Sequence, residues 1–247
     1  MPSTTPPSLS RKIAVLVDGD NAQPSLLKKI LAETGKYGII TIRRIYGDWT
    51  TSNMGGWKDI LHTHAIQPIQ QFRYTTGKNA TDSAMIIDAM DIMYTGSVEG
   101  FCIVSSDSDY TRLATRIREK GFFVMGVGRK TTPRAFVNAC EVFVYTENLA
   151  VDRDSSSKKG KKKPDSNAEP TVPDHLDLLR QAFDMVVEED GWAPLNMVGQ
   201  QLRQLDPGFD PRTYGHKQLS LLFKAHKDVF TVKKNKNELQ VKLAATD

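Results

Sequence analysis

Two apolar segments of the sequence, residues 13–17 and 100–106, each end at a pair of carboxylates. The acids concerned are Asp18, Asp20, Asp107 and Asp109. Apolar runs rich in β-branched residues indicate buried strands, and an open parallel sheet does its chemistry at the carboxyl ends of its strands. Four carboxylates gathered there would raise one another's pKa unless a cation compensated for their charge. The spacing therefore predicts a divalent metal site and, from it, phosphate chemistry.

Further polar residues extend this predicted site. Asp82 stands at the head of an apolar helix predicted over residues 81–94, where an acid either binds metal or simply caps the helix. Asp88, deeper in that helix, either reaches the site or pairs with an arginine. Asn21 could hold a water or a substrate phosphate without adding charge. Mg²⁺ or Mn²⁺ prefers carboxylate oxygens, and such an ion activates water and neutralises charge that develops on a phosphodiester.

Phosphate binding also needs cations outside the group of acids. Lys78 lies four residues before Asp82, so it could face the scissile phosphate. Each of the other candidates either contacts phosphate or is a solvated charge: Arg43, Arg44, Arg73, Arg112, Arg129, Lys130 and Arg134. The aromatic side chains that could stack on bases, or equally pack inside the protein, are Trp49, Trp57 and Phe72.

Residues 12–149 alternate between strand and helix patterns. Strands are predicted at residues 13–17, 38–46, 66–70, 101–105, 122–127 and 142–145. Helices are predicted at residues 24–36, 55–64, 81–94, 110–120 and 133–139, and the third of them should be buried because it is apolar almost all round. This alternation is typical of an α/β fold, a parallel sheet with helices on both faces.

The rest of the chain predicts a tail, a linker and a second unit. Residues 1–11 read as a disordered tail, and residues 150–173, rich in Ser and Lys, read as a flexible linker. Residues 174–247 predict helices at 175–188, 194–205 and 217–227, then a hairpin with strands at 229–233 and 239–243. This arrangement is typical of a small α+β winged-helix domain. Its lysines either suit RNA or serve only solubility: Lys217, Lys224, Lys227, Lys233, Lys234 and Lys236.

The composition limits the class of protein. The 247 residues carry 33 Lys and Arg against 29 Asp and Glu, a net charge of +4, so nucleic-acid binding would depend on local patches. Cys102 and Cys140 are the two cysteines, and both are expected to pack as small buried side chains. No stretch has the pattern of a signal peptide or of a membrane span, so a cytoplasmic location is expected and no membrane partner.

The acidic segments resemble the NYN family, the LabA-like branch of the PIN-like nucleases. The matching pieces are residues 16–21, residues 78–82 with Asp88 downstream, and residues 105–110 leading to 121–128. The resemblance spans about residues 12–149 and implies a Rossmann-like PIN fold with metal-dependent ribonuclease activity. Carried over by position, the metal-site acids are Asp18, Asp82, Asp107 and Asp109, with Asn21 as a polar catalytic-site residue and Asp20 and Asp88 as further metal candidates.

The second unit resembles the OST-HTH, or LOTUS, domain. The matching residues are 191–195, 199–205 and 209–219, of which Tyr214, Gly215 and Leu219 are the most telling. The resemblance implies a winged helix that binds RNA or a protein partner. A PIN-like domain joined to such a module fits bacterial proteins of RNA metabolism.

These observations predict a metal-dependent endoribonuclease that uses Mg²⁺ or Mn²⁺, with RNA as partner and a homodimer left open. Two other functions remain. In phosphatases of the haloacid dehalogenase class, an Asp-x-Asp pair after the first strand supplies a covalent nucleophile, although Asn21 and Ala22 here stand where that family has Thr or Val. A non-catalytic RNA-binding adaptor, with acids of structural role, is the second alternative.

Overall fold

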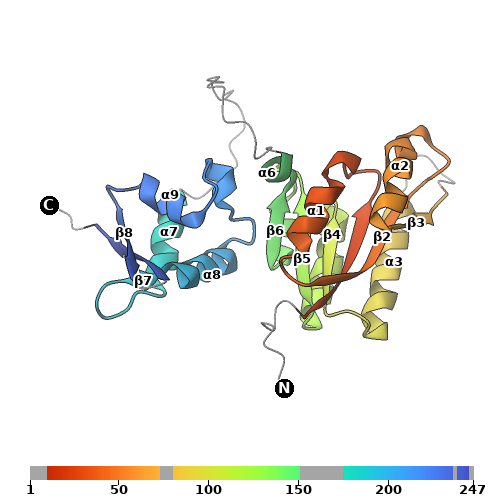
Figure 1. Cartoon of the computed structure of the whole chain (residues 1–247). Helices are drawn as coiled ribbons and strands as arrows, with labels where there is room; N and C mark the ends of the chain where they lie inside the picture. Colours follow the sequence, from red (N-terminus) through yellow and green to blue (C-terminus); the bar gives the residue numbers. More distant parts are fainter. Residues whose placement is uncertain (1–9, 73–79, 151–174, 236–237, 245–247) are drawn as a thin grey trace, which may run out of the picture. The chain divides into compact units, whose positions relative to one another are not determined.

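The computed structural model describes residues 10–72, 80–150, 175–235 and 238–244. The chain divides into two compact units, Met1–Ala150 and Val151–Asp247 (Figure 1). Within the described residues, no helix is both long enough and apolar enough to cross a membrane.

The N-terminal unit is built on a six-stranded parallel sheet with the order β3-β2-β1-β4-β5-β6 (Figure 1). The strands are β1 Lys12–Asp18, β2 Ile39–Gly47, β3 Gln67–Gln70, β4 Gly100–Val104, β5 Phe123–Gly128 and β6 Val142–Tyr145. The direction of the winding reverses between β1 and β4, which are paired through Val17 and Val104. Ligand sites of open α/β sheets lie at such a reversal, beyond the carboxyl ends of the strands.

Helices cover both faces of this sheet. They are α1 Leu27–Thr34, α2 Gly55–His64, α3 Ala80–Thr95, α4 Thr111–Glu119, α5 Arg134–Ala139 and α6 Thr146–Ala150. Alternate residues of β1 enter different cores: Leu16 packs with residues of α3, α4 and α5, and Val15 packs with residues of α1, α2 and α6. Burial on both faces explains why these strands read as continuous apolar runs. The predicted α/β fold is therefore confirmed.

The sequence analysis was wrong about the burial of one helix of this unit and missed another helix. Helix α3 is not buried all round, because Ile87 is 62% exposed and Tyr94 is 66% exposed on the side away from the sheet. A sheet covers only one side of a helix, so an apolar composition does not by itself bury every side chain. Helix α6 was not predicted, since its five residues are too few for a periodic pattern.

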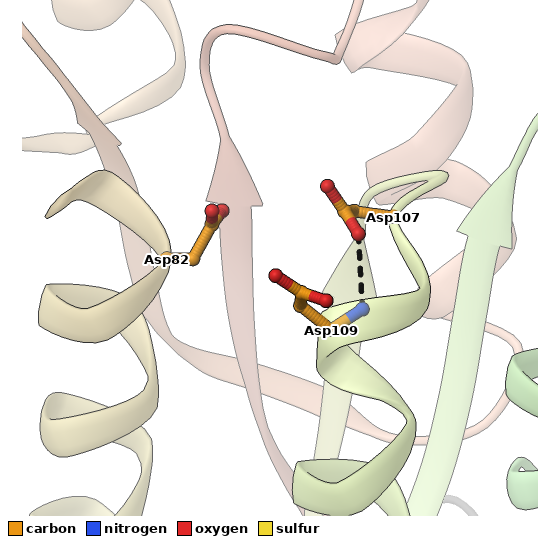
Figure 2. Close-up of side chains that lie close together, drawn as sticks. All are labelled: Asp82, Asp107 and Asp109. Carbon is orange, nitrogen blue, oxygen red and sulfur yellow. Dashed lines mark hydrogen bonds between the residues drawn. The ribbon is translucent and has the colours of Figure 1, made fainter. Parts of the chain in front are cut away.

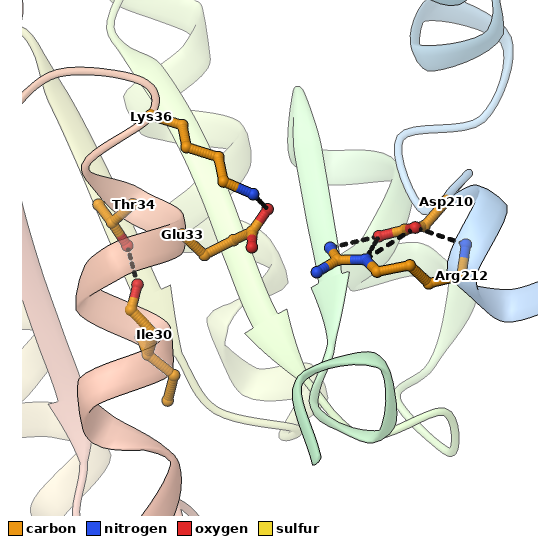
Figure 3. Close-up of polar contacts among 6 residues, drawn as sticks. All are labelled: Ile30, Glu33, Thr34, Lys36, Asp210 and Arg212. Carbon is orange, nitrogen blue, oxygen red and sulfur yellow. Dashed lines mark hydrogen bonds and ion pairs between the residues drawn. The ribbon is translucent and has the colours of Figure 1, made fainter. Parts of the chain in front are cut away.

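Local polar contacts mark the end of α1 (Figure 3). Thr34 Oγ1 donates to the carbonyl of Ile30 at 2.9 Å, and Lys36 Nζ pairs with Glu33 Oε1 at 2.8 Å. The amide of Gly35 donates to the Leu31 carbonyl at 2.9 Å, completing the last turn. The helix therefore ends at Thr34, slightly before the predicted end at residue 36.

In its described residues, the C-terminal unit contains three α-helices and a three-stranded antiparallel sheet, as expected for a winged helix. The helices are α7 His175–Asp184, α8 Leu195–Leu205 and α9 Leu219–Ala225, and the strands are β7 Ala193–Pro194, β8 Phe230–Asn235 and β9 Glu238–Leu243. The sheet order is β7-β9-β8. Helix α7 ends four residues before its predicted end, α9 is shorter at both ends, and β7 was missed because two residues carry no alternation.

A compact turn precedes α9 in this unit. Asp210 caps the 3-10 helix Pro211–Tyr214 by accepting from the amide of Arg212 at 2.8 Å. The Arg212 guanidinium also pairs with the same carboxylate, with Nε to Oδ2 at 2.8 Å (Figure 3). The turn ends at Gly215, whose φ of +80° lies in the left-handed region that favours glycine. Gly215 stands in the segment that resembled the OST-HTH pattern.

Candidate metal centre

Three carboxylates come together at the carboxyl edge of the sheet in the described part of the chain. One oxygen from each of Asp82, Asp107 and Asp109 can be chosen so that all three lie within 4.8 Å of one another (Figure 2). Asp82 is on the first turn of α3, and the other two follow β4. These three residues are called the acid cluster below. Two segments far apart in the sequence thus supply one group of ligand atoms.

The short helix after β4 orients two members of the cluster. Asp107 caps the 3-10 helix Ser108–Tyr110 by accepting from the amide of Asp109 at 2.9 Å (Figure 2). The amide of Asp107 in turn donates to Ser105 Oγ at 3.1 Å. Asp107 can cap this helix and also belong to the acid cluster, because one of its oxygens accepts from the backbone and the other is left to face the cluster.

A buried tyrosine holds the third member. The hydroxyl of Tyr110 donates to Asp82 Oδ1 at 2.6 Å, and Tyr110 itself is fully buried. Burial, followed by the charges of Asp107 and Asp109, raises the pKa of Asp82, against the lowering effect of the tyrosine hydrogen bond. Burial also raises the pKa of Tyr110, so its hydroxyl remains a donor. The ionised cluster is therefore electrostatically unfavourable on its own.

Asp18 is not one of the acids whose ligand atoms lie within 4.8 Å of one another. It is 1% exposed, and Oδ2 accepts from Asn21 Nδ2 at 2.7 Å and from Ser105 Oγ at 2.9 Å. Oδ1 accepts from the amide of Asp20 at 3.2 Å. Burial raises the pKa of Asp18, and the charge of Asp82 acts in the same direction. Asn21 therefore contacts Asp18 through the nitrogen of its amide.

The remaining candidate acids lie at two different places. Asp20 Oδ2 accepts from Thr81 Oγ1 at 3.2 Å, which ties the turn after β1 to the start of α3. Asp88 accepts short hydrogen bonds from the Tyr46 hydroxyl and from Arg44, so the pairing with an arginine that the sequence allowed is realised. Asp20 is thus a neighbour of the acid cluster, and Asp88 is engaged elsewhere.

The candidate phosphate-binding cations differ in their contacts and in their exposure. Arg129 donates its amide to Ser106 Oγ at 2.9 Å, which brings the loop after β5 beside the segment that carries Asp107. Lys130 donates its amide to Glu147 at 3.0 Å. Arg112 on α4 and Arg134 on α5 are exposed. Arg73 and Lys78 lie outside the described residues.

Three further candidates from the sequence have structural contacts. Arg43 donates to the carbonyl of His64 at 2.8 Å, at the end of α2. Trp57 is 1% exposed, and its indole donates to the carbonyl of Gly19 at 3.0 Å, so it packs in the core and offers no surface for a base. Trp49 is partly buried and donates to the carbonyl of Ile69 at 3.1 Å, whereas Phe72 is 49% exposed.

The acid cluster fits a hard divalent cation. Its ligand atoms are carboxylate oxygens, the type that Mg²⁺ and Mn²⁺ prefer. Asp107 is partly exposed and Asp109 is exposed, which leaves a route from solvent. A cation there would offset the burial and the neighbouring negative charges that raise the pKa of Asp82. The sequence analysis did not predict a role for Tyr110 or Tyr46. The signal available for Tyr110 was its position directly after Asp107 and Asp109.

The parallel sheet with acids at its carboxyl edge fits a PIN-like fold. The family model of the NYN domain matches residues 12–149, and the chain belongs to that family. The model of the OST-HTH/LOTUS domain matches residues 175–241, so the C-terminal unit is a domain of RNA-binding type. Both resemblances drawn from the sequence motifs are confirmed.

Two solved structures are similar to this chain. A protein of unknown function from Vibrio parahaemolyticus is 18% identical, with 57% of this chain and 96% of that chain covered and a TM-score of 0.47. An uncharacterized protein from Nitrosomonas europaea is 28% identical, with 39% of this chain and 95% of that chain covered and a TM-score of 0.29. Neither likeness assigns a function, and no protein with a curated description matches the chain.

Proposed function

We propose that this protein is a metal-dependent endoribonuclease. The observation that carries the proposal is the acid cluster, whose three carboxylates lie at the carboxyl edge of an NYN-family sheet with ligand atoms within 4.8 Å of one another. The attached domain of RNA-binding type supports RNA as the substrate. Asp82, Asp107 and Asp109 would hold one or two Mg²⁺ or Mn²⁺ ions.

When bound, such ions activate water and neutralise the charge that develops on the phosphodiester. The protein's own residues then have separate tasks. Tyr110 fixes the orientation of Asp82 through its hydroxyl. Asp18 holds Ser105 and Asn21, and so sets the shape of the two turns that carry the acids. Arg112, Arg129, Lys130 and Arg134 are exposed on loops or helix starts and are the proposed contacts to the RNA backbone.

A nuclease assay tests this proposal. Labelled single-stranded and structured RNA is incubated with Mg²⁺, with Mn²⁺ and with EDTA. We expect internal cleavage that needs a metal and that Asp107→Asn abolishes. Asp91→Asn is the matched control, because Asp91 is an exposed acid on α3 outside the acid cluster. RNA that stays intact in every metal arm but is bound tightly would instead identify an adaptor.

The phosphatase alternative is disfavoured by the state of Asp18. A covalent nucleophile needs an accessible oxygen, but Asp18 is 1% exposed and both of its oxygens accept hydrogen bonds. Membership of the NYN family points the same way. Release of phosphate from a small phosphoester, through a trapped acyl-phosphate on Asp18, is the result that would revive this alternative.

A further inference from the structure

Trp192, directly before β7 in the C-terminal unit, has two lysines of the sheet beside it. Lys233 Nζ stands 3.7 Å from the centre of the Trp192 ring, and Lys242 Nζ stands 5.9 Å from it. Trp192 is partly buried, Lys233 is partly buried and Lys242 is exposed. These three residues are called the Trp192 face below. An ammonium group within about 6 Å of an aromatic ring is attracted to its face.

The strand register explains why these side chains meet. Val241 pairs with Ala193 on one side and with Val232 on the other, and Val241 and Ala193 are fully buried. Neighbouring residues of a strand point to opposite faces. Lys233 and Lys242 therefore point away from the core that Val241 enters, and the ring of Trp192, directly before β7, lies next to them.

A glycine allows Lys242 to lie along this face. Gly191 has a φ of +78°, and a Cβ added there would lie 3.2 Å from Cε and Nζ of Lys242. Glu188, Glu189 and Asp190 precede this segment and are exposed. Within the described residues, neither Lys233 nor Lys242 forms a salt bridge with these acids or with Glu238, which lies at the opposite end of β9 from Lys242. The Trp192 face thus combines positive charge with an aromatic surface, the two features that single-stranded nucleic acid requires.

The helix that precedes the hairpin is less suited to RNA. Helix α9 has seven residues, of which Leu221, Lys224 and Ala225 are exposed. The exposed side chains of α9 itself include one cation, Lys224, and no amide or guanidinium that could read a base edge. The charge and ring of the Trp192 face, by contrast, match a phosphate backbone with an adjacent base.

We propose that the C-terminal domain binds single-stranded RNA through the Trp192 face, with Lys233 and Lys242 contacting phosphates and the indole contacting a base. This inference rests on the proposed function only in taking RNA as the ligand. It assigns the contact to the sheet surface of the domain, away from α9.

Fluorescence anisotropy tests the assignment with the full chain and a fluorescein-labelled oligouridylate. All variants carry Asp107→Asn so that the probe stays intact. Lys233→Gln with Lys242→Gln should raise Kd at least tenfold and should lower the slope of log Kd against log salt by about 1.4, since each lost single-strand phosphate contact removes about 0.7. The matched control is Lys224→Gln with Lys227→Gln, which removes the same charge near α9 and should change Kd less than about twofold.

A second pair of variants tests the ring. Trp192→Phe keeps an aromatic surface and should bind nearly as the parent does, whereas Trp192→Leu should raise Kd roughly tenfold, as expected for the loss of one stacked base. Equal melting temperatures would show that both variants are folded. The proposal is overturned if the control lysines matter as much as Lys233 and Lys242, or if the probe does not bind. Binding is measured without cleavage. If the parent chain did not cleave RNA, the proposed nuclease function would be refuted, but the Kd values of these variants could still be compared.

Discussion

Two buried tyrosines each donate a hydroxyl hydrogen bond to an aspartate on helix α3, but only one of these aspartates belongs to the acid cluster. Tyr110 contacts Asp82 and Tyr46 contacts Asp88. Burial raises the pKa of both phenols, so each hydroxyl stays protonated and acts as a donor. Replacing each tyrosine by phenylalanine removes the same hydroxyl oxygen from two similar surroundings, so the two variants can be compared directly.

The first prediction uses this comparison. Tyr110→Phe should weaken Mn²⁺ binding about 10- to 100-fold, because partners that orient a metal ligand contribute on that scale. Tyr46→Phe removes an equally buried hydroxyl but should leave Mn²⁺ affinity unchanged. Calorimetric titration of the metal into each variant gives the affinities. If both variants lose affinity equally, Tyr110 has only a structural role.

The second prediction concerns charge at Asp82. Its pKa is raised in the folded chain, so the stability it contributes is present below the pKa of an unfolded aspartate and is lost as pH rises through the folded-state value. Asp82→Asn removes the charge and keeps an oxygen that can accept from Tyr110. In EDTA at pH 7 we expect this variant to melt a few degrees higher than the wild type, and by a smaller margin at pH 4.

Thermal unfolding with and without Mn²⁺ checks this expectation. Adding Mn²⁺ should raise the melting temperature of the wild type and leave that of Asp82→Asn unchanged, because ligand binding stabilises only a chain that binds it. Asp91→Asn, on the same helix but outside the acid cluster, is the control and should melt as the wild type does. A variant less stable than the wild type in EDTA would contradict the electrostatic account.

At the scale of elements, the turn after β1 is held in a narrow space. A Cβ added at Gly19 would lie 2.7 Å from Cε of Met54 and 2.8 Å from the carbonyl oxygen of Tyr46. The amide of Gly19 also donates to that carbonyl at 2.9 Å. The backbone of this turn therefore packs directly against β2, and this contact positions Asp18 and Asn21.

The third prediction follows from this packing. Gly19→Ala should destabilise the N-terminal unit by about 1–3 kcal/mol, the usual range for overpacking. Gly55→Ala is the matched substitution: nothing lies within 4 Å of its Cβ position, and its backbone is helical. It should be neutral or stabilising by up to about 1 kcal/mol. Urea unfolding gives both values, and equal stability of the two variants would show that the turn can move.

Most elements could be predicted from the sequence, because strands buried on both faces appear as unbroken Val and Ile runs. Helix α2 was predicted at residues 55–64, where it is found. The surroundings of single residues could not be predicted in this way. Whether Asp88 meets a metal or Arg44 depends on which strand residue lies opposite α3, and no local pattern carries that information. The positions of the acids were predicted, but the burial of Asp18 behind them was not.

At the scale of the molecule, the two units have separate hydrophobic cores. The acid cluster lies entirely in the N-terminal unit, and the Trp192 face lies entirely in the C-terminal unit. The proposed RNA cleavage is therefore assigned to the N-terminal unit, and the proposed RNA recognition to the C-terminal unit.

The fourth prediction tests that division. A chain of residues 1–150 should cleave RNA with a kcat within about threefold of the full chain and with a KM raised about tenfold or more, the pattern of lost uniform binding. Steady-state kinetics on a single-stranded substrate with Mn²⁺ provide both constants. An unchanged KM would refute a recognition role for the C-terminal unit.

The pairing of β1 with β4 has a consequence during synthesis. The hydrogen bond between Ser105 and Asp18 joins residues 87 positions apart. A ribosome must therefore release everything up to the segment after β4 before the acids can assemble. Until then the nascent chain has no complete cation site, so the proposed capacity to cut RNA would arise only after Asp109 has left the ribosome.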